Sequence, residues 1–217
     1  MVDGYSLSRK IEEFLPANVA FSTRLIRDDE PAEPCDGERT STRPSAARTQ
    51  EFRAGRRCAR EALRALGISG RHSLARELDG APLWPPGTVA SIAHSNGLCV
   101  AVAARLSHYS GIGIDIEIEN AIDIAVREII SDEEEYAAAM ACCETNDRNA
   151  VLPLLFVAKE SIYKAGRGVV AAPDTFCEIR VSFSGRRFGA SVSGTLFSGR
   201  ATRFDGVVAA FSAPTSS

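Results

Sequence analysis

Two acidic residues in the middle of the chain have the spacing of a divalent-cation site. Residues 111–119 read G-I-G-I-D-I-E-I-E, so isoleucine alternates strictly with glycine or an acid. Because alternate residues of a strand point to opposite faces, the pattern predicts buried isoleucines with Asp115 and Glu117 projecting together from the other face. Carboxylate oxygens suit Mg²⁺, and the glycines on that face are expected to leave room for a bulky ligand. The alternative is a half-solvated strand with its acids in water.

A later segment places lysines at helical spacing. Residues 156–165 read F-V-A-K-E-S-I-Y-K-A, so Glu160 and Lys164 share one face of the predicted helix. An ordinary surface ion pair is the simplest interpretation. However, the 25 basic residues are 22 arginines and only three lysines, Lys10, Lys159 and Lys164. A compact cation with a transferable proton suits a phosphate contact or a proton donor.

The first half of the chain carries the features of an anion site. Residues 39–64 hold eight arginines and two acids, in a chain of net charge −3. Residues 45–66 have helical periodicity, so several of these arginines share a face. His94 lies at the expected tip of a hairpin formed by 89–93 and 98–104. A solvated helix face and a structural histidine are the simpler interpretations, and a site for several phosphates is the more specific one.

The order of elements predicts an α+β fold in two halves with antiparallel sheets. The expected halves are residues 1–108 and 109–217, joined by 107–110, with an exposed loop at 28–44. Local patterns predict the elements of each half. Helices are expected at 7–15, 45–66, 123–130, 131–143 and 153–165, and strands at 18–26, 89–93, 98–104, 111–119, 176–183, 187–192, 195–204 and 207–212.

Composition argues against several classes of protein. The chain has neither a signal-peptide pattern at its start nor a run of 18 apolar residues, so no membrane association is expected. Its six cysteines form no C-x-x-C pair, which predicts free thiols in a cytoplasmic protein. The negative net charge and the few aromatic residues near the arginines argue against nucleic-acid binding.

Four motifs together resemble the two-half class of phosphopantetheinyl transferases, in the branch found with siderophore and mycobacterial-type systems. The resemblance covers about residues 45–167 and leaves 1–40 and 176–217 unmatched. The motifs are R-x-x-E-F-x-x-x-R-x-x-A-R at 48–60, W-P-x-G-x-x-(A/G)-S-(I/L)-x-H at 84–94, G-(I/V)-D-x-E at 113–117 and (F/W)-x-x-K-E-(A/S)-x-x-K-A at 156–165.

The resemblance implies a monomeric pseudo-dimer of two similar α+β halves, with coenzyme A and Mg²⁺ between them. Asp115, Glu117 and Glu160 are the implied ligands of Mg²⁺, or of Mn²⁺ in its place. Glu160 and Lys164 are the implied catalytic residues. The implied contacts to the 3′-phosphate and pyrophosphate of coenzyme A are Arg48, Arg56, Arg76, His94, Lys159 and Lys164.

The implied activity is transfer of the 4′-phosphopantetheine arm of coenzyme A to a serine of an apo acyl or peptidyl carrier protein, with release of 3′,5′-ADP. Glu160 or a metal-bound water would take the serine proton, and Lys164 would stabilise or protonate the leaving group. Three alternatives use the same residues differently: a magnesium-dependent phosphohydrolase acting on a nucleotide-like substrate, an arginine-rich nucleic-acid-binding module, and a non-catalytic relative that binds carrier proteins.

Overall fold

The computed structural model describes residues 3–26, 38, 45–70, 72–77, 80–142 and 148–215. Most of the loop expected at 28–44 therefore lies outside the described residues. The helices are α1 (Gly4–Phe14), α2 (Ala46–Ala65), α3 (Arg127–Ile130), α4 (Glu133–Cys142) and α5 (Arg148–Gly166), with short 3₁₀ turns η1 (Ile124–Val126) and η2 (Phe176–Glu178). The strands are β1 (Ala20–Leu25), β2 (Thr88–Ser95), β3 (Leu98–Arg105), β4 (Gly113–Ile118), β5 (Arg180–Ser184), β6 (Arg187–Val192), β7 (Thr195–Phe204) and β8 (Val207–Pro214).

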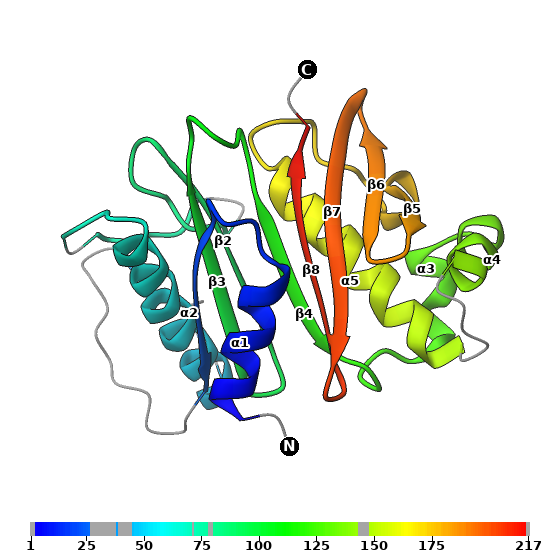
Figure 1. Ribbon diagram of the computed structural model, residues 1–217, viewed down its shortest axis with the longest axis horizontal. Helices are drawn as coiled ribbons and strands as arrows, with labels where there is room; N and C mark the ends of the chain where they lie inside the picture. The colour runs from blue at the N-terminus through cyan, green and yellow to red at the C-terminus, as the bar shows by residue number, and fades with distance from the viewer. Residues whose placement is uncertain are drawn as a thin grey trace.

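The strands form two antiparallel sheets, which confirms the predicted α+β class. The first has the order β1-β3-β2 and the second the order β4-β8-β7-β6-β5. The sheets meet where β2 lies beside β4 (Figure 1). A side chain bridges this seam, because the amide of Ile114 donates to Ser91 Oγ at 3.2 Å.

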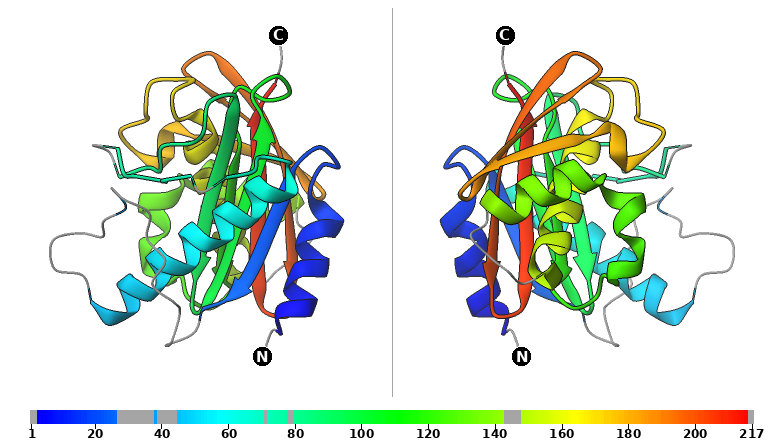
Figure 2. Two further views of the ribbon diagram at one scale, coloured as in Figure 1. Left: turned by 90° about the vertical axis from the view of Figure 1, so that its left-hand side faces the viewer. Right: turned by 90° about the vertical axis from the view of Figure 1, so that its right-hand side faces the viewer.

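The helices cover the two faces of the sheets unequally. Helix α1 lies on one face, against β1 and β7, whereas α2 packs on β1 and β3 and α5 packs on β4 and β8. The side views in Figure 2 show α2 and α5 on the face opposite α1. Among the described residues, no helix combines the length and the apolar character needed to cross a membrane.

The isoleucine face of β4 forms the core under α1, as its alternation predicts. Ile112, Ile114 and Ile116 are buried there together with Leu7 and Ile11 of α1. The opposite face of β4 therefore points to α5.

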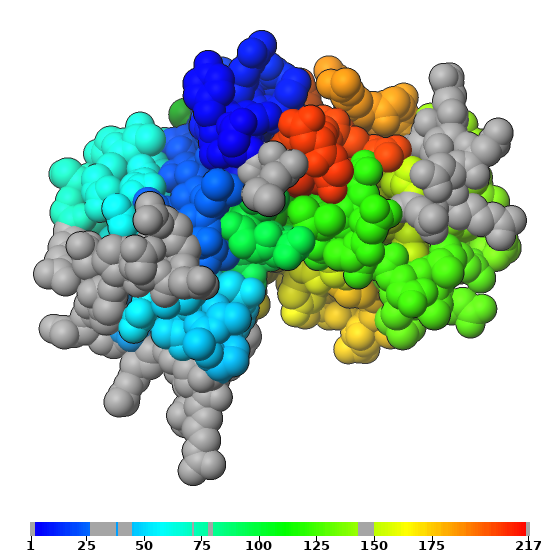
Figure 3. Space-filling model, turned by 90° about the horizontal axis from the view of Figure 1, so that it is seen from below, coloured from blue at the N-terminus to red at the C-terminus, as the bar shows by residue number. Residues whose placement is uncertain are grey.

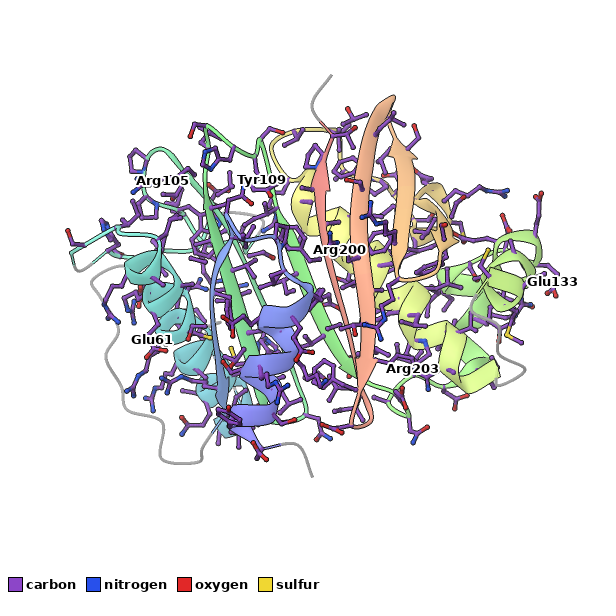
Figure 4. The ribbon with its side chains drawn as sticks, in the orientation of Figure 1. Glu61, Arg105, Tyr109, Glu133, Arg200 and Arg203 are labelled. Carbon is purple, nitrogen blue, oxygen red and sulfur yellow. The ribbon has the colours of Figure 1, made fainter. Side chains whose placement is uncertain are left out.

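The connection between β3 and β4 is also fixed to its surroundings. Tyr109, labelled in Figure 4, donates to Asn18 Oδ1 at 2.7 Å. Its ring packs edge-on against Phe211 of β8, with 6.4 Å between the ring centroids. The linker between the two halves is thus held by contacts to both.

The glycines next to the acids of β4 allow α5 to approach closely. A Cβ on Gly113 would lie 1.8 Å from the carbonyl oxygen of Ser161, and one on Gly111 would lie 2.1 Å from that of Ala165. The expectation that these glycines make room for a ligand is wrong, because the α5 backbone fills the space.

Three local predictions also need correction. His94 lies within β2, so the predicted tip at 94–97 narrows to Asn96–Gly97, whose φ angles are 45° and 82°. Both positive angles suit a two-residue type I′ turn. The helix predicted at 131–143 begins at Glu133 and is capped by Asp132, whose Oδ1 accepts from the amide of Glu135 at 2.8 Å.

The late helix begins earlier than its pattern predicts. It starts at Arg148, so Pro153 lies inside the helix and not at its start. Proline removes one helical hydrogen bond, but the neighbouring Leu152 and Leu155 are fully buried. Core packing therefore overrides the local preference.

Replacing Gly113 with alanine tests the close approach of α5 to β4. We expect Gly113→Ala to destabilise the protein by ~3 kcal/mol or more, because the new methyl group overlaps backbone that cannot move independently. Chemical denaturation measures the change. Gly189→Ala in β6 is the matched control, since its Cβ would lie 3.6 Å from the nearest atom, an ordinary contact. Equal stability of the two variants would contradict the packing argument.

Candidate active site

A cleft of about 640 Å³ lies between α2 and α5, above the seam of β2 and β4. Figure 3 shows the surface hollowed between the atoms of these two helices. Residues from both halves of the chain line the cleft, so it exists only in the folded protein. Seven of the nine predicted site residues line it: Arg48, Arg56, Arg76, His94, Asp115, Glu160 and Lys164.

One wall of the cleft pairs Arg48 of α2 with His94 of β2. Arg48 Nη1 lies 3.0 Å from His94 Nε2 and 3.1 Å from Glu51 Oε2. Since a guanidinium only donates, His94 Nε2 is the acceptor. Burial lowers the pKa of His94, and nearby Arg48 and Lys164 lower it further while Glu51 opposes them. A neutral imidazole is therefore favoured, and the arginine carries the positive charge.

Arg56 is a buried cation on the same wall. Its Nε donates to the carbonyl of Leu74 at 2.8 Å, and its guanidinium carbon lies 4.6 Å from the ring centroid of Phe52. Burial lowers the pKa of Arg56 to about 10, with Glu38 opposing and nearby arginines adding to the effect. Arg56 still carries its charge at neutral pH, and its orientation is fixed before any ligand binds.

Arg76 reaches the cleft from the loop after α2. Its Nε donates to the carbonyl of Gly80 at 3.2 Å, and it contributes to lowering the pKa of Arg56. The two guanidinium groups thus lie near each other on one wall. Repulsion between neighbouring cations makes such a position suitable for an anion.

The opposite wall holds the acids and Lys164. Lys164 Nζ lies 2.6 Å from Asp115 Oδ1, 3.3 Å from the carbonyl of Ile114 and 4.0 Å from Glu160 Oε2. Burial raises the pKa of Asp115 to about 6, although Lys164 lowers it, and Glu160 and Glu117 raise it further. The acids are therefore close enough to repel one another, and the lysine ammonium lies between two of them.

Glu117 does not line the cleft, and its side chain accepts hydrogen bonds from other residues. Its Oε1 accepts from Ser95 Oγ and from the amide of Ile118, the latter at 2.8 Å. Ser95 belongs to β2, so this contact joins β2 to β4 next to the cleft. Local sequence patterns do not identify Ser95, because they predict a turn at this residue and not a strand that brings it to Glu117.

The acids fit a hard divalent cation by their chemistry. In the described part of the chain, no three His, Cys, Asp or Glu side chains stand close enough together to hold a metal ion. Instead, the Lys164 ammonium occupies the position between Asp115 and Glu160. Carboxylate oxygens are magnesium ligands, and a buried acid with a raised pKa gains from a nearby cation. Asp115 and Glu160 thus have the donor chemistry for such an ion, whereas Glu117 is engaged by Ser95 and by the amide of Ile118.

Lys159 is absent from the cleft, contrary to the predicted pyrophosphate contact. It is fully buried, and its Nζ contacts Glu135 Oε2 at 2.6 Å, the carbonyl of Ile130 at 2.7 Å and that of Phe176 at 3.1 Å. Successive helix residues point about 100° apart, so Lys159 faces the core while Glu160 faces the cleft. Phosphate contact by Lys159 has no support in this geometry.

Both halves of the chain match family models. Residues 38–104 match the 4′-phosphopantetheinyl transferase N-terminal domain, and residues 111–210 match the 4′-phosphopantetheinyl transferase superfamily. The two matched regions contain all the predicted site residues.

Curated relatives are similar over parts of different length. The 4′-phosphopantetheinyl transferase Npt of Nocardia iowensis is 33% identical over 176 residues, which cover 80% of this chain and 76% of Npt. The 4′-phosphopantetheinyl transferase PptT of Mycobacterium tuberculosis is 36% identical over 57% of this chain and 53% of PptT. Enterobactin synthase component D of Salmonella typhi is 34% identical over 58% of this chain and 51% of its own length. The matches to these last two proteins span about half of each. With a family model on each half and a relative similar over most of its length, the chain belongs to the 4′-phosphopantetheinyl transferase family.

Proposed function

We propose that this cleft transfers the 4′-phosphopantetheine arm of coenzyme A to a serine of an apo acyl or peptidyl carrier protein. The observation that carries the proposal is the pairing, across one cleft, of an arginine wall with the cluster of Asp115, Glu160 and Lys164. Coenzyme A carries a 3′-phosphate and a pyrophosphate, which require cations on one side. The attacked phosphorus requires charge neutralisation and a base on the other side. Family membership supports the same activity.

The arginine wall is suited to the nucleotide end of coenzyme A. Arg48, Arg56 and Arg76 present guanidinium groups, which bind phosphate through paired hydrogen bonds. His94, kept neutral by burial, adds a further polar contact. The buried Arg56 has the least freedom to lose on binding, because Leu74 and Phe52 already orient it.

The acids are suited to Mg²⁺ or Mn²⁺. Asp115 and Glu160, with Glu117 released from Ser95, would hold the ion. When bound, it would neutralise charge on the pyrophosphate and make the phosphorus a better electrophile. Lys164 would then be free of Asp115 and available to the phosphates.

Glu160 and Lys164 would handle the charges and protons of the transfer. Glu160 lies at the cleft with about one quarter of its side chain exposed, so it can reach a serine from outside and accept its proton. The serine oxygen forms a bond to phosphorus, and the bond from phosphorus to the 3′,5′-ADP oxygen breaks. Lys164 stabilises or protonates that departing oxygen.

The alternatives fit less well. A phosphohydrolase would use the same acids with water, but both family models and the relatives from Nocardia iowensis and Mycobacterium tuberculosis are named as 4′-phosphopantetheinyl transferases. A nucleic-acid-binding surface is disfavoured by the net charge of −3 and by the family models, which describe transferases. A non-catalytic relative has no need of the acid and lysine cluster. We therefore retain the transferase.

We further propose a monomer acting in the cytoplasm. Both walls of the cleft come from one chain, so a second copy is not required to complete it. Cys58 and Cys99 are free and buried, which suits a reducing compartment.

Asp115→Ala tests the acid cluster. We expect a loss of transfer of about 1000-fold or more, because the variant lacks a carboxylate that would hold the cation facing the pyrophosphate. The assay is the mass gain of an apo carrier protein incubated with coenzyme A and Mg²⁺. Glu119→Ala is the matched control: Glu119 extends the same strand pattern but pairs with Arg203, labelled on β7 in Figure 4. Full activity of Asp115→Ala would eliminate the proposed site.

The metal is tested by thermal unfolding without any carrier. Mg²⁺ and coenzyme A together should raise Tm by about 5 °C more than the sum of their separate effects, because each stabilises the site of the other. Asp115→Asn should lose this extra shift, and Glu119→Gln should keep it. A shift that survives in Asp115→Asn would place the ion elsewhere.

The arginine wall is tested with 3′,5′-ADP, which lacks the pantetheine arm. Arg48→Met should weaken its binding about 10-fold, because one charge-assisted contact to phosphate is lost. Isothermal titration calorimetry measures the affinity. The exposed Arg64→Met, at the far end of α2, should leave it unchanged. Equal weakening by both variants would point to a general charge effect and contradict a defined contact.

A further inference from the structure

A second cavity, of about 700 Å³, adjoins the cleft and shares Glu160 and Tyr163 with it. Its remaining walls are formed by the end of α3, at Glu128 and Ile129, and by residues 173–177 with Ile179 around η2. Its lining, within the described ranges, contains acids but no Lys, Arg or His. Glu160 therefore stands on the boundary between a cationic cleft and a cavity unsuited to phosphate.

Lys159 lies in the core and connects two walls of this second cavity by hydrogen bonds. Its Nζ donates to the carbonyl of Ile130, the last residue of α3, and to that of Phe176, the first residue of η2. Its third partner is Glu135 of α4. An ammonium group has three N–H donors, and each has an acceptor here, which a planar guanidinium could not match.

Glu135 extends the connection to the sheet. Its Oε1 accepts from the amide of Val181 in β5 at 2.6 Å, while its Oε2 faces Lys159. Four elements, α3, α4, η2 and β5, are thereby fixed to the middle of α5, and Figure 1 shows them gathered beside that helix. Cys177 Sγ also lies 3.8 Å from the carbonyl of Glu128, so α3 and η2 are in contact.

A buried ion pair is an inefficient means of stabilising a protein. Apolar side chains of similar size often serve as well or better, because both charges lose their hydration. What such a pair provides is a defined geometry, since the hydrogen bonds are directional and leaving one unmade is costly. Here that geometry is imposed one residue before Glu160, on the walls that flank Glu160.

We propose that Lys159 is a positioning residue, which with Glu135 fixes α3 and η2 against α5 and thereby sets the orientation of Glu160 for transfer. It touches neither the phosphates nor the serine. The inference rests on the proposed function in that Glu160 acts in the transfer. A misplacement of a reacting group by ~1 Å lowers a rate by roughly 100-fold, so loosened walls should reduce kcat.

The test compares Lys159→Met with the double variant Lys159→Met/Glu135→Gln. The single variant leaves a buried carboxylate without its cation, and its folding is expected to suffer. The double variant removes both charges and keeps an oxygen for the amide of Val181. We expect it to fold, to bind 3′,5′-ADP as the wild type does, to keep its KM for coenzyme A, and to lose about 100-fold in kcat. Hydrogen exchange should become faster at residues 127–131 and 175–179 and stay unchanged in α2.

Two results would overturn the proposal. Weakened 3′,5′-ADP binding, as expected for Arg48→Met, would make Lys159 a phosphate contact. An unchanged kcat in the folded double variant would leave the pair with a purely structural role. If the wild type itself modifies no carrier protein, the proposed function fails, whereas hydrogen exchange still decides whether Lys159 holds the two walls.

Discussion

The close approach of α5 to β4 determines the geometry of the site. Without side chains at Gly111 and Gly113, the carbonyl oxygens of Ala165 and Ser161 lie where Cβ atoms would otherwise be. The short separation between the backbones of α5 and β4 places the acid face of β4 directly under α5. It also puts Lys164 Nζ 2.6 Å from Asp115 Oδ1. A bulkier residue at either glycine would separate two motifs that lie far apart in the sequence but form one cluster.

Ion pairs and hydrogen bonds between residues that line the cleft balance its charges. Lys164 lies among the oxygens of Asp115 and Glu160, and Arg48 is shared between Glu51 and His94. Each of these contacts satisfies a group that the proposed ligands would otherwise engage. The proposed binding of coenzyme A with a divalent cation would therefore be an exchange of partners within a cleft whose outline is already present, which would limit the ordering cost of association.

Neighbouring residues of helix α5 face two different environments, the cleft and the core of the second half. Glu160 and Lys164 face the cleft, whereas Lys159 is enclosed on the opposite side by Glu135 and two backbone carbonyls. Because the helix is packed on both sides, its rotation and height are fixed by contacts in the core of the second half. The proposed catalytic groups, Glu160 and Lys164, are consequently held in place by that core.

The sequence by itself determined the local features of the site: the acid face of β4, the shared face of Glu160 and Lys164, and the motifs that identify the family. These follow from strand and helix periods, which covalent geometry fixes. Only the tertiary structure decided what lies across from each residue. In the folded protein Lys159 is buried and Lys164 forms an ion pair with Asp115. The backbone of α5 fills the space beside the glycines, and Glu117 accepts a hydrogen bond from Ser95. Such contacts depend on packing between distant segments, about which a local pattern carries no information.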